Sequence, residues 1–283
     1  MYTSIIIVGT GKIACSCLDY VVGRTQEENI LVYEYCSSSL SILRKKAEQH
    51  GVGYAAFEVQ SEITGKLLAI DGMTLIISAN NTYLFPACIC GRRNFTIVNY
   101  HSALLPKYAG MNAITWTIYS GENTGGITWH LVDEQIDHGD ILIQKTCDIG
   151  GDMTALQLNR IYDELAFGAF KEIFPSLLNN TYRSVKQTDT NQRKYRKAEI
   201  PSDGRLDLSR STKFLYRLLR SLDYGIMQLF PMPVVQYEEQ IFCVKRYQFS
   251  ASVYETRKIS LEGERLTIKD ETGLLHLWLL KEK

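Results

Sequence analysis

The sequence predicts an α/β protein with a mainly parallel sheet, followed by a smaller domain rich in β-strands. Three observations support this fold class. Short runs of β-branched residues alternate with helical patterns over residues 1–150, a polar and basic stretch at 179–205 has almost no apolar periodicity, and short strand patterns return after it. Strands that alternate with helices build βαβ units, and the strands of such units run parallel.

In the first domain, the β-branched runs predict strands that are separated by helical patterns. The expected strands are 4–8, 30–33, 74–78, 95–99 and 127–132. The expected helices are 13–22, 40–50 and 154–174. The last of these has apolar residues at intervals of three and four, as expected for a long amphipathic helix that closes the domain.

The second domain begins after the polar stretch, which we interpret as a connector. One helix is expected at 212–222, and the following strands are 234–244, 257–261, 266–268 and 274–280. The expected boundaries are 1–190 for the first domain, 191–205 for the connector and 206–283 for a small OB-like domain of one helix and several strands.

Composition and charge exclude several classes of protein. With 45% hydrophobic and 22% charged residues, disorder is excluded as the main state. Lys and Arg number 31, as do Asp and Glu, and this balance argues against general binding of nucleic acid. No window resembles a signal peptide or a bilayer-spanning segment of roughly 18 apolar residues, so we expect a soluble cytoplasmic protein.

The cysteines indicate reduced thiols rather than disulfides or a metal site. Seven is an odd number, and a chain of this length can build a core without disulfides. The pairs Cys15/Cys17 and Cys88/Cys90 have C-x-C spacing, whereas zinc ligands usually have C-x2-C spacing with a matching second pair. We therefore expect no metal.

A glycine-containing turn follows the first expected strand. Gly9, Gly11 and Ala14 fit the pattern G-x-G-x-x-A, and Glu34 lies where an acid that binds ribose would be expected. This Rossmann-like feature favours an NAD(P)-dependent oxidoreductase as one alternative. The other interpretation is structural, since many α/β sheets need glycines where the backbone bends sharply at the first turn.

The middle of the chain has polar groups that suit acyl transfer. Asn99 and His101 lie two residues apart at the end of an apolar strand, so both side chains leave the same face. A second strand carries His130 and leads into the polar loop 133–140, which contains three aspartates. An amide and a protonated imidazole can stabilise an oxyanion, and a carboxylate can orient the imidazole. Taken singly, each residue could equally be a satisfied structural group.

Four segments resemble the signature of the folate-dependent N-formyltransferases. They are Asn99-Tyr100-His101, the run LLPKYAG at 104–110, the run GITWH at 126–130 and the run DHGDIL at 137–142. This family includes methionyl-tRNA formyltransferase, nucleotide-sugar N-formyltransferases and formylation domains of peptide synthetases. The segments 111–116 and 154–159 are more similar to the peptide-synthetase domains, and 204–222 is similar to the segment that leads into the family's C-terminal domain.

The resemblance implies a formyltransferase fold, a formyl donor and a set of site residues. The donor would be N10-formyltetrahydrofolate, bound as a cosubstrate. Asn99 and His101 would stabilise the tetrahedral oxyanion, while Asp137 would position His101 and manage the proton of the amine. Contacts with the donor would come from two segments and from neighbouring residues, namely Ser78, Asn80, Tyr83, Leu84, Leu105, His130, Val132 and Asp133.

The resemblance also limits the acceptor to an amine. The expected acceptor is a small or carrier-bound biosynthetic intermediate, either a nucleotide-activated amino sugar or an amino acid of secondary metabolism. Methionyl-tRNA is the alternative within the family, and it would contact the basic residues between Arg193 and Arg220. A module that binds folate or a partner without chemistry is the alternative of another class, and a homodimer is left open.

Overall fold

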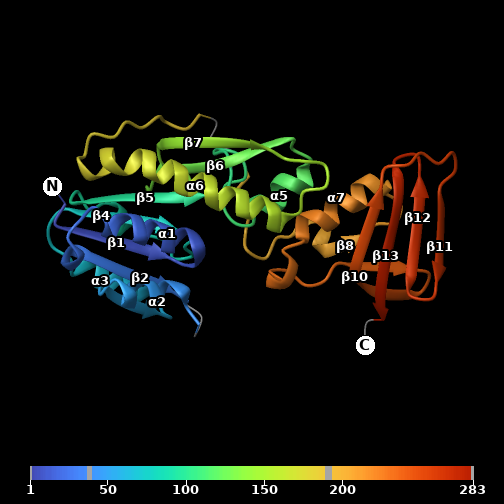
Figure 1. Cartoon of the computed structure of the whole chain (residues 1–283), viewed down its shortest axis with the longest axis horizontal. Helices are drawn as coiled ribbons and strands as arrows, with labels where there is room; N and C mark the ends of the chain where they lie inside the picture. The colour runs from blue at the N-terminus through green and yellow to red at the C-terminus, as the bar shows by residue number, and fades with distance from the viewer. Residues whose placement is uncertain (1, 37–39, 189–192, 282–283) are drawn as a thin grey trace. The chain divides into compact units, whose positions relative to one another are not determined.

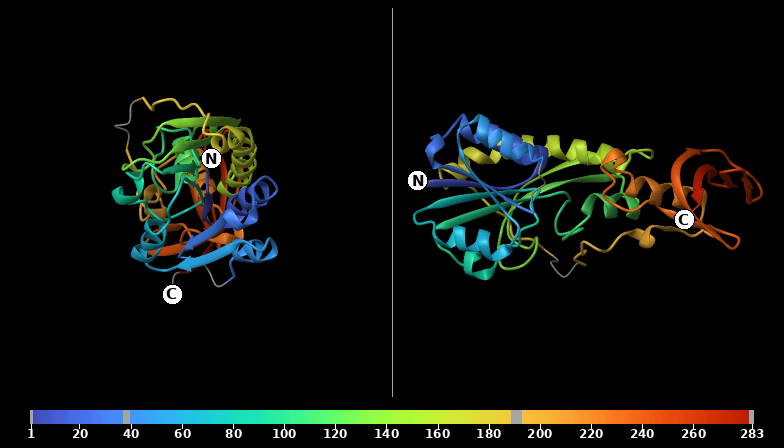
Figure 2. Two further views of the ribbon diagram at one scale, coloured as in Figure 1. Left: turned by 90° about the vertical axis from the view of Figure 1, so that its left-hand side faces the viewer. Right: turned by 90° about the horizontal axis from the view of Figure 1, so that it is seen from below.

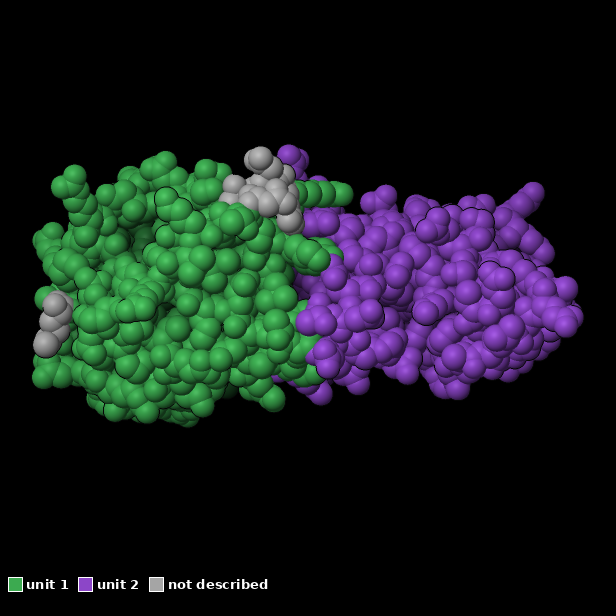
Figure 3. Space-filling model, turned by 90° about the horizontal axis from the view of Figure 1, so that it is seen from above, with its two compact units in different colours: residues 1–110, 125–147, 161–194 green, residues 111–124, 148–160, 195–283 purple. Residues whose placement is uncertain are grey.

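The computed structural model describes residues 2–36, 40–188 and 193–281. These residues form two compact units (Figure 3). The first unit comprises residues 1–110, 125–147 and 161–194, and the second comprises 111–124, 148–160 and 195–283. The first two residues of the predicted connector at 191–205 lie outside the described residues.

The first unit is built around a seven-stranded sheet with the order β3-β2-β1-β4-β5-β6-β7 (Figure 1). Its strands are β1 (Ser4–Gly9), β2 (Ile30–Tyr35), β3 (Gly53–Phe57), β4 (Thr74–Ala79), β5 (Phe95–His101), β6 (Thr124–Leu131) and β7 (Ile141–Asp148). All pairings from β3 to β5 are parallel, whereas β6 runs antiparallel to β5. The predicted mainly parallel α/β sheet is thus confirmed.

Helices cover both faces of this sheet (Figure 2). On one face lie α1 (Gly11–Val22), α2 (Ile42–Gln49) and α6 (Ala155–Leu178), and on the other lie α3 (Gln60–Leu68) and the short α4 (Ala87–Cys90). The strands β1 and β4 are buried almost throughout. Strands covered on both faces are expected to contain continuous apolar runs, and these strands contain the runs 5–8 and 75–77.

The long helix α6 fixes the position of β6, which carries part of the site. Trp129 of β6 is fully buried, and its indole N–H donates to the carbonyl of Ala166 at 2.9 Å. The hydroxyl of Tyr162 accepts from the backbone N–H of Gly126 at 2.8 Å. Burying an aromatic side chain contributes roughly 1.5–3 kcal/mol, provided that its polar atom finds a partner as it does here.

The second unit contains a six-stranded sheet with the order β11-β12-β13-β10-β9-β8. Its elements are α5 (Ala113–Ser120), β8 (Arg205–Leu206), α7 (Thr212–Leu222), β9 (Val234–Tyr237), β10 (Gln240–Ser250), β11 (Lys258–Glu262), β12 (Arg265–Asp270) and β13 (Gly273–Lys281). The neighbours are antiparallel except for β8 and β9. The expected β-rich C-terminal domain is confirmed, but the run predicted as one strand at 234–244 is a hairpin of two strands, β9 and β10.

The core of the second unit lies between α7 and one face of the sheet. Leu215 and Leu218 of α7 are fully buried, as are Leu266 and Leu277 of β12 and β13. The helix begins at a good cap, since the side chain of Ser211 accepts from the N–H of Phe214. Among the residues that the structure describes, no helix is long and apolar enough to cross a membrane.

Candidate active site

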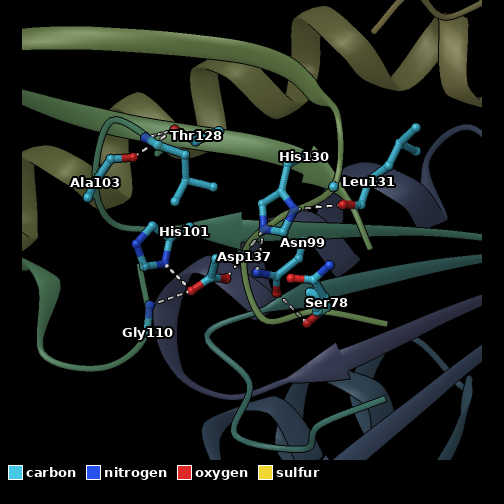
Figure 4. Close-up of polar contacts among 12 residues, drawn as sticks. Ser78, Asn99, His101, Ala103, Gly110, Thr128, His130, Leu131 and Asp137 are labelled. Atoms are coloured by element: carbon cyan, nitrogen blue, oxygen red, sulfur yellow. Dashed lines mark hydrogen bonds and ion pairs between the residues drawn. The ribbon is translucent and has the colours of Figure 1, made fainter. Parts of the chain in front are cut away.

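The antiparallel pairing of β5 with β6 places Asn99 directly opposite His130 (Figure 4). Nδ2 of Asn99 lies 3.1 Å from Nε2 of His130. On the other side of the amide, the hydroxyl of Ser78, at the end of the neighbouring strand β4, donates to Oδ1 of Asn99 at 2.7 Å. The strand end at which the sequence predicted polar groups therefore holds a carboxamide between a hydroxyl and an imidazole.

Asp137 enters this site from the loop after β6. Its Oδ2 accepts from the backbone N–H of Gly110 at 2.7 Å and lies 3.4 Å from Nδ1 of His101. Its Oδ1 lies 3.5 Å from Nε2 of His130. The side chains of Asp137 and His101 are only 10% and 7% exposed, so the carboxylate and the imidazole face each other away from bulk water. Asn99, His101 and Asp137 are thus brought together in one unit.

The electrostatics of this pair favour an ionised carboxylate. Burial of the Asp137 carboxyl opposes ionisation, but the two neighbouring histidines, His101 and His130, and the hydrogen bond from Gly110 outweigh it and hold the pKa well below its usual range. The ring nitrogen Nε2 of His101 lies 2.9 Å from the carbonyl of Tyr108. Because a carbonyl can only accept, Nε2 carries a hydrogen, and Nδ1 is the nitrogen of His101 that can exchange a proton beside Asp137.

The backbone of the Asp137 loop is held in place by close contacts. Asp137 has φ of 51°, in the left-handed region that Asp tolerates better than most residues. A Cβ on Gly139 would lie 1.9 Å from the carbonyl oxygen of Leu131, so only glycine fits this approach. Gln187, in the segment after α6, donates from Nε2 to the carbonyls of Asp137 at 2.9 Å and Gly139 at 2.8 Å. Sequence reasoning missed Gln187, because it lies in a stretch interpreted as a surface connector.

The residues predicted to contact the donor fall into two groups. Ser78 and His130 contact Asn99, and Leu105 is buried with its N–H donating to Thr128 Oγ1. The others lie in the segments after β4 and β6, and they are Asn80, Tyr83, Leu84, Val132 and Asp133. Among them, Leu84 is 57% exposed and Tyr83 is buried. Their contacts with the donor stay predictions.

The glycine turn after β1 has a structural explanation. A Cβ on Gly9 would lie 2.0 Å from the carbonyl oxygen of Ala79 in β4, so glycine is needed for close packing of the strands. The Glu34 carboxylate is 2% exposed and accepts from the hydroxyls of Ser41 and Tyr54, the latter at 2.7 Å. Both hydrogen bonds go to Oε2, so this oxygen is engaged by the protein itself, and this weakens the interpretation of Glu34 as a ribose ligand.

Residues 5–172 match the sequence profile of the formyl transferase family. The chain belongs to this family. It is similar to the bifunctional polymyxin resistance protein ArnA of Wigglesworthia glossinidia brevipalpis, with 33% identity over 44% of this chain and 19% of that protein. It is also similar to the methionyl-tRNA formyltransferase of Azobacteroides pseudotrichonymphae, with 28% identity over 65% of this chain and 56% of that protein. The chain therefore matches only part of the length of these curated relatives.

Two solved structures match this formyl transferase family member over almost its whole length. WlaRD, described as a sugar 3N-formyl transferase in the presence of dTDP and 5-N-formyl-THF, has a TM-score of 0.79 and 19% identity and covers all of both chains. The N-formyltransferase from Helicobacter canadensis, in complex with folinic acid and dTDP-3-aminofucose, has a TM-score of 0.79 and 17% identity over 99% of this chain and 100% of that one. At these identities the likeness establishes the fold, and the predicted formyltransferase fold is confirmed.

Proposed function

We propose that this chain transfers the formyl group of N10-formyltetrahydrofolate to the primary amine of a nucleotide-activated amino sugar. The observation that carries the proposal is the meeting of Asn99, His101 and Asp137 at the end of strand β5 in a member of the formyl transferase family. An amide N–H and an imidazole beside a buried carboxylate suit direct attack of an amine on a formyl carbon, because the oxyanion and the proton both have partners.

The proposed donor site lies in the segments that follow β4 and β6. The thiol of Cys90 is within hydrogen-bond distance of the carbonyls of Phe85 and Asp133, at 3.4 and 3.3 Å, so these two segments lie side by side. Val132 packs on the same apolar cluster as Tyr83 and Phe85. An apolar wall with backbone polar groups nearby suits a flat heterocycle such as a pterin.

In the proposed reaction the amine nitrogen of the acceptor attacks the formyl carbon. A carbon–nitrogen bond forms, the carbonyl oxygen becomes an oxyanion, and a free N–H of Asn99 donates to it. Nδ1 of His101, held beside Asp137, moves the amine proton toward N10 of the donor. The bond between N10 and the formyl carbon then breaks, and tetrahydrofolate leaves with that proton. Asp137 stays ionised and stabilises the imidazolium form of His101.

The choice of acceptor depends on the solved structures rather than on the three site residues. WlaRD and the Helicobacter canadensis N-formyltransferase, each of which matches this chain over nearly the full length of both proteins, were studied with dTDP or a dTDP-linked amino sugar. The curated relatives include methionyl-tRNA formyltransferases, but this chain carries 31 basic and 31 acidic residues and so lacks the basic surplus expected for a polyanion. Because the three site residues do not select among amines, the test also includes carrier-bound amino acids.

The experiment is to measure release of tetrahydrofolate from N10-formyltetrahydrofolate with a panel of acceptors. The panel contains dTDP- and UDP-linked amino sugars, free and carrier-bound amino acids, and methionyl-tRNA. We expect turnover with a nucleotide-linked amino sugar, and loss of about a hundredfold or more in Asn99→Ala, which removes an oxyanion donor. Preferred turnover with methionyl-tRNA or a carrier-bound amino acid would overturn the proposed acceptor, and no formyl transfer to any amine would overturn the proposed reaction.

A further inference from the structure

Four polar side chains beside the reacting groups form one continuous chain of hydrogen bonds. Nδ2 of Asn81 lies 3.3 Å from Oγ of Ser78, which lies 2.7 Å from Oδ1 of Asn99. Nδ2 of Asn99 lies 3.1 Å from Nε2 of His130 (Figure 4). Ser78 and His130 are only 1% and 2% exposed, so water cannot easily replace either partner of Asn99. All four residues belong to the first unit.

The first end of this chain has a fixed direction. The backbone N–H of Tyr83 donates to Oδ1 of Asn81 at 2.9 Å, and Nδ2 of Asn81 donates to the carbonyl of Tyr83 at 3.0 Å. A backbone N–H only donates and a carbonyl only accepts, so the amide of Asn81 has one orientation. Its Nδ2 therefore donates to Ser78. The hydroxyl of Ser78, having accepted there, donates its own hydrogen to Oδ1 of Asn99.

The second end has a fixed direction as well. Nδ1 of His130 lies 2.6 Å from the carbonyl of Leu131, so Nδ1 carries a hydrogen. Because Oδ1 of Asn99 accepts from Ser78, Nδ2 of Asn99 points an N–H toward Nε2 of His130. A proton on Nε2 would face that N–H at 3.1 Å, whereas Asp137 Oδ1 is farther away at 3.5 Å. Of its two neighbours, the Asn99 amide is the nearer, and Nε2 is thus placed to accept from Asn99.

We propose that Ser78 and His130 are positioning residues that hold the carboxamide of Asn99 in a single orientation. This inference rests on the proposed function, in which Asn99 faces the oxyanion. One N–H of Asn99 is used by His130, and the other is left for the reacting oxygen. A flipped amide would turn Oδ1 toward His130 and change which atom the substrate meets.

The kinetic test compares His130→Leu with His130→Gln. Leu cannot accept from Asn99, and we expect kcat to fall about tenfold or more with little change in KM for the donor, as for a misplaced catalytic group. Gln can place an amide oxygen close to where Nε2 lies, and we expect it to restore most of kcat. His50→Gln is the matched control, because His50 contacts Asp19 at 2.6 Å and has no contact with this hydrogen-bond chain.

A double-mutant cycle separates positioning from a merely structural role. If His130 acts through Asn99, His130→Leu costs less than about twofold in an Asn99→Ala background, because effects of residues that act as a unit are not additive. Ser78→Ala is expected to behave in the same way. An equal loss of kcat in both backgrounds would overturn the proposal.

A measurement without substrate keeps this inference distinct from the proposed function. Nitrogen-15 NMR of the histidine rings in the unmodified full chain reports which ring nitrogens carry hydrogens. We expect His130 to have a hydrogen on Nδ1, which faces the carbonyl of Leu131, and none on Nε2, which faces Nδ2 of Asn99. A hydrogen on Nε2 would overturn the inference, even if formyl transfer is confirmed, and the expected tautomer would support it even if the acceptor is wrong.

Discussion

At the scale of single residues, Asp137 combines burial with a negative charge that the site uses. Its pKa is held well below the usual range, so we expect the carboxylate to stay ionised throughout the acidic range in which the protein is folded. Asp137→Asn removes the charge that stabilises the His101 imidazolium. We predict a loss of about a hundredfold or more in kcat, measured as release of tetrahydrofolate.

The matched control for this prediction is Asp140→Asn on the same loop. The carboxylate of Asp140 accepts from the Ser184 hydroxyl at 3.2 Å and faces neither histidine of the site. We expect near-normal kcat for this variant. Equal losses in Asp137→Asn and Asp140→Asn would mean that the loop, and not the charge of Asp137, supports the reaction.

Asp163 of α6 shows the opposite electrostatic effect. Burial raises the pKa of this carboxyl to about 6, although the charge of Lys12 lowers it in part. The folded state therefore binds a proton more tightly than the unfolded state, whose Asp titrates near 4, and stability falls as pH rises through this window. We predict that Asp163→Asn raises the free energy of unfolding by about 1–2 kcal/mol at pH 8, with a smaller gain at pH 4.5, as measured by urea titration. A loss of stability at pH 8 would contradict this.

From the sequence it was possible to predict that Asn99, His101 and Asp137 come together, but not which contacts their side chains make. Alternation along a strand and a motif with known spacing are local features of the sequence, so both could be used for prediction. The partners of Asn99 could not be predicted, because the position of His130 depends on the register between β5 and β6. Contact of Ser78 with the donor stays a prediction, and the hydrogen bond from its hydroxyl to Asn99 is a second contact that the sequence did not indicate.

At the scale of elements, the segment after α6 is a strap over the Asp137 loop. Val185 pairs with Ile141 in an isolated β-bridge, and Gln187 then donates to the carbonyls of Asp137 and Gly139. These contacts hold a loop whose residue Asp137 has positive φ. Sequence periodicity could not reveal them, because a segment that contacts a loop through two backbone carbonyls needs no apolar pattern.

This strap gives a prediction for Gln187. Gln187→Ala removes two donated hydrogen bonds, and we expect kcat to fall roughly tenfold as Asp137 loses its position. Gln187→Glu is expected to be worse, because a carboxylate would face two carbonyl oxygens. Hydrogen exchange of the 132–140 segment should be faster in both variants. The control is Gln135→Ala, at an exposed position of the same loop; unchanged exchange in Gln187→Ala would refute the role of the strap.

At the scale of the whole molecule, the order of elements along the chain predicts the class of fold but not the division of residues between units. Residues 111–124 and 148–160 belong to the second unit, although they lie within the predicted first domain. Helix α5 illustrates the reason. It is buried from Ala113 to Ile118, so it has no polar face to give a helical period, and its packing against α7 joins residues about 100 positions apart. Contacts between residues so far apart along the chain leave no pattern in the local sequence.

In the second unit, one buried carboxylate joins α7 to the sheet. Asp270 accepts from the N–H and hydroxyl of Thr212 at 2.8 Å each, from Thr272, and from Arg257 at 2.6 Å. Burial opposes its ionisation, but the hydrogen bonds from Thr272 and Thr212 outweigh it and lower its pKa to about 2. The native state therefore favours the ionised carboxylate more than the unfolded state does. The resulting stability is complete above about pH 4 and is lost as pH falls toward 2.

We predict that Asp270→Asn lowers the free energy of unfolding of the second unit by about 2 kcal/mol at pH 7, because the charge-assisted hydrogen bonds become weaker. The difference from the parent protein should shrink below about pH 4, where the parent carboxyl becomes protonated as well. Urea unfolding followed by hydrogen exchange of α7 and β12 measures both effects, with the exposed neighbour Glu271→Gln as the control. A difference that persists unchanged at pH 2.5 would mean that the shape of Asp270, rather than its charge, stabilises this unit.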